Sequence, residues 1–63
     1  MAARSLRDVA ETMEKGGLKE EAIEFFTQAG DLYAGEEQPS EANKCRLRVA
    51  ALSAEVERYA PAA

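Results

Sequence analysis

The chain has 63 residues, of which 46% are hydrophobic and 32% charged, and it contains no Trp, no His and one cysteine. A chain this short forms at most one small domain and buries only about 60% of the surface that its unfolded form exposes. Its formal net charge of −4 argues against a nucleic-acid-binding protein, because such proteins usually carry a basic surface. We therefore expect one small helical domain that does not bind DNA or RNA.

The composition also bears on cofactors, catalysis and location. A single cysteine, Cys45, cannot form an internal disulfide, which fits a reducing, cytoplasmic setting. Without His, clustered metal ligands or a nucleophile–base pair, the sequence predicts no metal site, no cofactor and no enzyme activity. The longest uncharged run lies within residues 49–54, which is too short to cross a membrane, and residues 1–7 lack the apolar segment of a signal peptide.

The first predicted helix covers residues 3–14. Its apolar residues follow helical spacing and form one narrow stripe: Leu6, Val9, Ala10 and Met13. Ser5 and Asp8 have the spacing of a capping box, so Ser5 is an alternative start. Gly16 and Gly17 end the helix, because glycine adopts positive φ without a steric penalty at the C-terminal cap.

The second predicted helix covers residues 18–33 and has a wider apolar arc than the first. We expect such a helix to pack on two sides, against the first helix and against the segment that follows it. Gly30 lowers the helix propensity by about 1 kcal/mol relative to alanine. We therefore expect a neighbouring backbone to approach the helix closely at this glycine.

A polar loop is predicted over residues 34–39, followed by Ser40 as the N-cap of a third helix over residues 41–59. Pro61 limits any extension of this helix. Its apolar stripe is the most regular in the chain: Ala42, Cys45, Val49, Leu52, Val56 and Tyr59. A short coiled-coil seam is one reading of this stripe, and the first helix of a second repeat is the one we favour.

The helix–Gly-Gly–helix pattern, with Ala22, Phe26 and Ala29 spaced as A-x3-F-x2-A, resembles a tetratricopeptide-type hairpin. The predicted fold is all-α: this hairpin and a third helix, about one and a half repeats of an α-solenoid, in one segment over residues 1–63. A single hairpin cannot bury both of its faces, so stacking and binding are expected rather than catalysis. One alternative is a small structural module that self-associates through an open face of the third helix.

Charge is distributed unevenly along the chain. Residues 8–41 hold ten acids and two bases, whereas residues 43–49 hold three bases and no acid. Lys44 and Arg48 are four positions apart and therefore share one side of the third helix. This pair is either part of a solvated face or a small basic surface that meets an acidic partner.

Two further features are expected to have structural rather than catalytic roles. Glu36 and Glu37 are adjacent carboxylates without a neighbouring metal ligand or base, so we expect a solvated loop rather than acid–base catalysis. Cys45 lies on the apolar stripe, and we expect it to be buried as a small hydrophobic residue.

The most specific motifs of the chain are Gly35-Glu36-Glu37 and Ala42-Asn43-Lys44-Cys45. With these motifs, residues 22–59 resemble the soluble NSF attachment proteins (SNAPs), which are adaptors of SNARE disassembly. Further matching positions are Ala22-Ile23, Gln28-Ala29-x-Asp31-x-Tyr33, Ser40, Val49-Ala50 and Glu57-x-Tyr59. The resemblance implies a solenoid whose concave face binds the acidic SNARE helix bundle and links it to the NSF ATPase in vesicle-mediated transport and membrane fusion.

The resemblance also implies the site residues and the location. It places Lys44 toward the SNARE bundle and matches Arg48 to another cation on the same face, and it implies a cytoplasmic protein that reaches membranes only through SNAREs. This prediction requires that both cations point to one surface and are not held in intramolecular ion pairs. The family's membrane-touching loop and acidic C-terminal region lack counterparts here, so we expect partial SNARE contact without disassembly activity.

Overall fold

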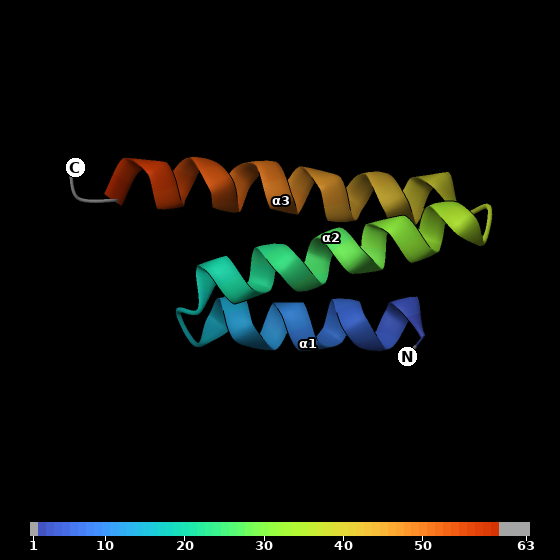
Figure 1. Ribbon diagram of the computed structural model, residues 1–63, viewed down its shortest axis with the longest axis horizontal. Coiled ribbons are helices and arrows are strands. Elements are labelled where there is room, and N and C mark those ends of the chain that lie inside the picture. Colours follow the sequence, from blue (N-terminus) through green and yellow to red (C-terminus); the bar gives the residue numbers. More distant parts are fainter. Residues whose placement is uncertain (1, 60–63) are drawn as a thin grey trace.

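The computed structural model describes residues 2–59 and contains three helices, α1 (Ala3–Lys15), α2 (Lys19–Gly35) and α3 (Pro39–Tyr59). They form an elongated layer in which α2 lies between α1 and α3 and runs antiparallel to both (Figure 1). No strand occurs among the described residues. The predicted all-α class, a helical hairpin followed by a third helix, is confirmed.

The turn from α1 to α2 closes with a pair of backbone hydrogen bonds that defines a Schellman cap. The Leu18 N–H donates to the Met13 carbonyl (2.9 Å) and the Gly17 N–H donates to the Glu14 carbonyl (3.1 Å). Gly17 has a φ of 85°, which glycine adopts without strain. The expected role of the Gly-Gly pair as a helix stop is therefore confirmed.

The turn from α2 to α3 repeats this geometry with a different sequence. The Gln38 N–H donates to the Tyr33 carbonyl (2.9 Å) and the Glu37 N–H donates to the Ala34 carbonyl (3.2 Å). Glu37 takes the position of Gly17, with a φ of 59°. A side chain in this left-handed region carries a steric cost that Gly17 avoids.

The predicted loop over residues 34–39 is wrong, because α2 continues through Gly35 and α3 begins at Pro39. Ser40 is not the N-cap. The first hydrogen bond of α3 runs from the Ala42 N–H to the Gln38 carbonyl (3.0 Å), which leaves Pro39 as the first helical residue. Proline suits this position because its fixed φ is helical and its missing N–H has no partner to lose.

The start of α1 also differs from the Ser5 alternative. The helix begins at Ala3, and no side chain caps its N-terminus. The Leu6 N–H donates to the Ala2 carbonyl (3.1 Å), so Ser5 already lies inside the first turn. The capping-box spacing of Ser5 and Asp8 therefore does not mark the boundary of this helix.

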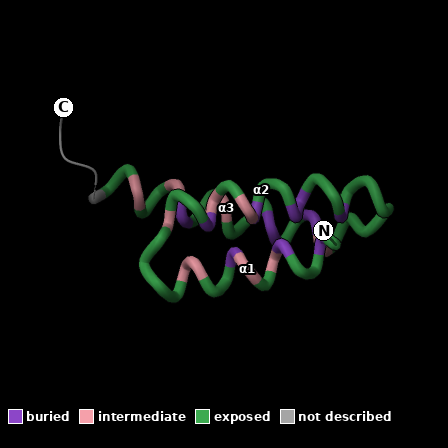
Figure 2. Tube along the Cα trace, turned by 60° about the horizontal axis from the view of Figure 1, so that its bottom comes forward, coloured by how far each residue is buried: buried purple, intermediate pink, exposed green. Residues whose placement is uncertain are grey.

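The core forms where the two outer helices meet α2 (Figure 2). Its buried members come from all three helices: Ala3, Leu6, Ala10, Ala22, Phe26, Ala29, Tyr33, Ala42, Cys45 and Leu52. The regular stripe of α3 supplies the last three and packs against α2, so this stripe is not an open face. The side chain of Tyr59, the last predicted member of the stripe, lies outside the described residues.

At Gly30 the backbone of α2 lies close to α3. A Cβ atom built on Gly30 would lie 3.3 Å from the Cβ of Cys45 and 3.6 Å from the Ala42 carbonyl oxygen. The packing reason expected for this glycine is thus confirmed: the absence of a side chain lets α3 approach the backbone of α2.

Replacing Gly30 with leucine should destabilise the fold by at least about 1–3 kcal/mol, because the added side chain overpacks the contact between α2 and α3. The matched control is Gly35→Leu, since a Cβ at Gly35 meets no atom within 4 Å. Thermal unfolding followed by circular dichroism measures both variants. Equal melting temperatures would contradict the proposed role of Gly30.

Replacing Glu37 with glycine should stabilise the fold by about 0.5 kcal/mol. Removing the side chain from the left-handed conformation should raise the free energy of unfolding by about 1–2 kcal/mol. The larger conformational entropy of glycine in the unfolded chain offsets part of this increase. Glu36→Gly is the control, because Glu36 has a φ of −91° and gains nothing from glycine. Chemical denaturation should show opposite shifts for the two variants, and shifts in the same direction would exclude strain at Glu37.

Candidate functional site

An open groove of about 400 Å³ lies between α1 and α3, over α2. Phe26 from α2 and Cys45 from α3 supply apolar surface at its base, and both side chains are almost fully buried. The remaining lining residues are mainly charged or exposed: Arg7, Glu11, Lys44, Leu47 and Arg48. The groove therefore combines an apolar base with three cations and one carboxylate on its walls.

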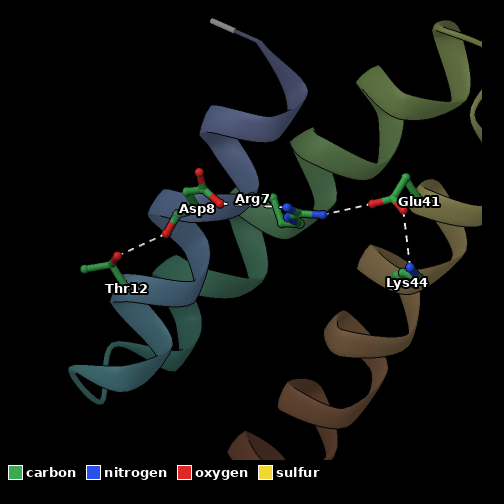
Figure 3. A network of polar contacts seen from close by, with 5 residues as sticks. All are labelled: Arg7, Asp8, Thr12, Glu41 and Lys44. Carbon is green, nitrogen blue, oxygen red and sulfur yellow. Dashed lines mark hydrogen bonds and ion pairs between the residues drawn. The ribbon is translucent and has the colours of Figure 1, made fainter.

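Two ion pairs connect α1 to α3 across this groove. A guanidinium nitrogen of Arg7 lies 2.9 Å from Oε2 of Glu41, as Figure 3 shows. A guanidinium nitrogen of Arg48 lies 3.1 Å from Oε1 of Glu14. The direction of charge is reversed between the two pairs, because the cation comes from α1 in the first and from α3 in the second.

The structure brings Lys44 and Arg48 to the same groove, so they meet the first condition of the site prediction. They do not meet the second, because neither cation is free. Lys44 Nζ lies 3.3 Å from Oε1 of Glu41, one turn earlier on α3, and Arg48 contacts Glu14. The expectation of two unpaired cations is therefore wrong, whereas their role in binding remains a prediction.

Both pairs are weakly held. The side chain of Lys44 is 70% exposed and that of Arg48 is 54% exposed, and surface pairs of this kind contribute about 0–1 kcal/mol. Glu41 also accepts the shorter bond from Arg7, so Lys44 is its second partner. Oε1 of Glu14 is buried and accepts no hydrogen bond, so its contact with Arg48 is purely electrostatic. Lys44 can thus exchange its carboxylate at small cost, whereas loss of Arg48 would leave the buried oxygen of Glu14 without a compensating charge.

Arg7 is a groove residue that the sequence analysis did not identify. Its side chain is 29% exposed and extends from α1 toward α3. Cations four positions apart on one helix are apparent from the sequence, whereas the alignment of cations from different helices is not. The position of Arg7 directly after Leu6 was the available signal, because it places Arg7 at the edge of the apolar stripe of α1.

The structure also reports on the carboxylates and on metal binding. Glu36 and Glu37 are exposed in the turn between α2 and α3, as expected for a solvated pair. Across residues 2–59, no three Cys, Asp or Glu side chains are grouped so that they could hold a metal ion. No helix in the same part of the chain combines the length and apolar character that crossing a membrane requires.

Cys45 behaves as the buried hydrophobic residue that the stripe predicted. Its relative exposure is 1%, and burial raises the pKa of its thiol above the ordinary value of 9.0. Arg7 opposes this rise in pKa, whereas Glu41 and Glu11 add to it. Because the thiolate is the reactive form, a buried thiol with a raised pKa is inert.

We therefore expect alkylation of Cys45 by iodoacetamide at pH 8 to be at least tenfold slower in the folded chain than in denaturant. The pKa of Cys45 is higher in the folded chain than in the unfolded chain, so the folded chain keeps the thiol proton to a higher pH. The free energy of unfolding should therefore fall as the pH rises above about 9. Mass spectrometry over a denaturant series measures the rate. Labelling as fast in the folded state as in the unfolded state would contradict the burial.

Comparison with known proteins identifies the family of this chain. The sequence model of the family "Soluble NSF attachment protein, SNAP" matches residues 1–63. The chain is 37% identical over 59 residues to an alpha-soluble NSF attachment protein of Vitis vinifera, covering 94% of this chain and 20% of that protein. It is 52% identical over 40 residues to a beta-soluble NSF attachment protein of Bos taurus, covering 64% of this chain and 13% of that protein.

An alpha-soluble NSF attachment protein of Mus musculus is 50% identical over 40 residues, covering 64% of this chain and 14% of the mouse protein. The chain thus spans no more than a fifth of the length of these curated relatives. No solved structure matches it. Because the family model covers its whole length, the chain belongs to the SNAP family.

Proposed function

We propose that this chain forms part of the SNARE-binding surface of a SNAP-type adaptor and acts by attachment rather than by catalysis. The observation that carries the proposal is the family match over residues 1–63. The fold supports it, because a layer of stacked helices with a charged groove offers a surface for another helical protein. The relatives are named for attachment to NSF, and the proposed adaptor role rests on these names.

The proposed contact is electrostatic. Carboxylates of a SNARE helix replace Glu41 and Glu14 as the partners of Lys44 and Arg48, and Arg7 keeps its bond to Glu41. The exchange at Lys44 costs little, because surface ion pairs are worth about 0–1 kcal/mol. At Arg48 the new contact must also offset the loss of the cation beside the buried Oε1 of Glu14. Contacts of this kind act mainly on the encounter rate and on orientation, so binding should weaken as salt is added.

The remaining parts of the adaptor role follow from the family and extend past this segment. We propose that the NSF contact belongs to regions of the longer relatives that these 63 residues do not span. A cytoplasmic location, with membrane contact only through bound SNAREs, is part of the same proposal.

Reversing both cations, Lys44→Glu with Arg48→Glu, should reduce binding to an assembled SNARE four-helix bundle at least tenfold. The reversal replaces attraction by repulsion at two positions of the groove. A pull-down of the bundle by the 63-residue chain, repeated at two salt concentrations, measures the effect. The difference between wild type and variant should shrink at high salt, because screening weakens exposed charges.

The matched control reverses two cations outside the groove, Arg4→Glu with Arg58→Glu, and changes the net charge equally. This variant should bind within about twofold of the wild type if the contact is specific to the groove. Equal losses in both double variants would show a non-specific charge effect. Unchanged binding of the Lys44 and Arg48 variant would remove these residues from the site.

A further inference from the structure

The ion pair between Glu14 of α1 and Arg48 of α3 is unequal, because its two members differ in burial. The side chain of Glu14 is 24% exposed, and its Oε1, which lies 3.1 Å from Arg48, is buried and accepts no hydrogen bond. The side chain of Arg48 is 54% exposed. A buried charge needs a compensating partner, whereas water solvates an exposed guanidinium. Glu14 therefore depends on Arg48 more than Arg48 depends on Glu14.

The ion pairs of Glu41 show the contrast. Glu41 contacts Arg7 at 2.9 Å as well as Lys44 at 3.3 Å, so it keeps a cation when Lys44 leaves (Figure 3). The buried Oε1 of Glu14 accepts no hydrogen bond from a second donor that could replace Arg48. Transfer of Lys44 to a partner thus leaves Glu41 paired, whereas transfer of Arg48 leaves Glu14 with an uncompensated buried oxygen.

Arg48 is poorly placed to hold a partner's carboxylate while it also contacts Glu14. Glu11, Glu14 and Lys15 line the wall of α1 beside Arg48. A carboxylate brought to Arg48 in its present position meets two negative charges and one positive charge on this wall, and like charges at short range repel. We therefore expect Arg48 to turn toward the partner and to leave Glu14 when an acidic helix binds.

We propose that Glu14 is an intramolecular competitor of the partner: it holds Arg48 in the free chain and thereby lowers the affinity of the groove for acidic helices. This inference rests on the function proposed above, because it concerns the same two cations. A partner's carboxylate gains only the difference between its own contact with Arg48 and the contact that Glu14 loses.

This competition selects among acidic partners. A single carboxylate gains little by displacing Glu14 from Arg48. A partner with a second carboxylate also reaches Lys44, where the exchange leaves Glu41 paired with Arg7. Because Lys44 and Arg48 are four positions apart, the favoured partner is a helix with two carboxylates about one helical turn apart.

Replacing Glu14 with glutamine removes the competing charge and keeps the shape of the side chain. The variant should bind an assembled SNARE four-helix bundle at least about fivefold more tightly than the wild type, because Arg48 is then free before the partner arrives. Isothermal titration calorimetry of the 63-residue chain at one salt concentration measures the Kd. The matched control Glu24→Gln removes one negative charge from an exposed position of α2, about 200° around the helix from Phe26, and should leave the Kd within about twofold.

A double-mutant cycle separates competition for Arg48 from a general effect of charge. Arg48→Gln removes the cation that Glu14 holds, so the addition of Glu14→Gln to this variant should change the Kd by less than about twofold. A gain in affinity that persists without Arg48 would overturn the inference, because Glu14 would then act on the partner by repulsion alone. Weaker binding by Glu14→Gln than by the wild type would also overturn it, because Glu14 would then position Arg48 for binding.

The unequal dependence within the pair is measurable without any partner. Arg48→Gln should lower the melting temperature by about 4 °C or more, because the buried oxygen of Glu14 loses its compensating charge. Glu14→Gln leaves a solvated guanidinium and a neutral amide, so it should lower the melting temperature by less than half as much. Thermal unfolding followed by circular dichroism measures both variants, and equal losses would overturn the inference.

The inference and the proposed function fail in different ways. If neither the wild type nor Glu14→Gln binds the SNARE bundle, the function proposed for the groove is overturned, and the inference falls with it. If the wild type binds and Glu14→Gln binds no better, the SNARE-binding surface stands and only the competition by Glu14 is overturned. Binding by Glu14→Gln alone would support both, with the wild-type affinity held below detection by Glu14.

Discussion

The fold depends on the close contact between α2 and α3 at Gly30. A Cβ at position 30 would lie only 3.3 Å from the Cβ of Cys45. Because Gly30 has no Cβ, the two helices can approach more closely there than they could around a larger residue. This approach buries Phe26 and Leu52 almost completely and lets α2 serve both outer helices. The groove between α1 and α3 exists because a single narrow helix separates them.

The two turns reach one backbone solution from different sequences. Gly17 adopts positive φ freely. Glu37 is held in the same region by two hydrogen bonds of the turn, from its own N–H to the Ala34 carbonyl and from the Gln38 N–H to the Tyr33 carbonyl. Packing of the flanking helices therefore imposes the second turn on a residue that does not favour it. Both turns leave three residues between helices, and α1 and α3 run parallel to each other on opposite sides of α2 (Figure 1).

Hydrophobic periodicity was sufficient to predict three helices, the stop at Gly17 and the packing of Gly30. The boundaries near Ser40 were wrong because local composition favours a loop, whereas Pro39 is compatible with a first helical turn. The site was predicted only within α3. Lys44 and Arg48 do line one groove. Glu41 lies three positions before Lys44, so helical spacing alone could have identified this partner. Glu14 and Arg7 approach from α1, and their contacts depend on the distance between helices, which the sequence pattern does not contain.

The cross-groove ion pairs have a mechanical consequence. Arg7 with Glu41 and Glu14 with Arg48 each join residues 34 positions apart, so they form two equivalent links between the parallel helices α1 and α3. The packed core joins α1 to α2 and α2 to α3, and the two ion pairs add a direct electrostatic link between the outer helices. A competing charge that takes one member of a pair therefore removes one of these links, while the packing of both outer helices against α2 stays in place.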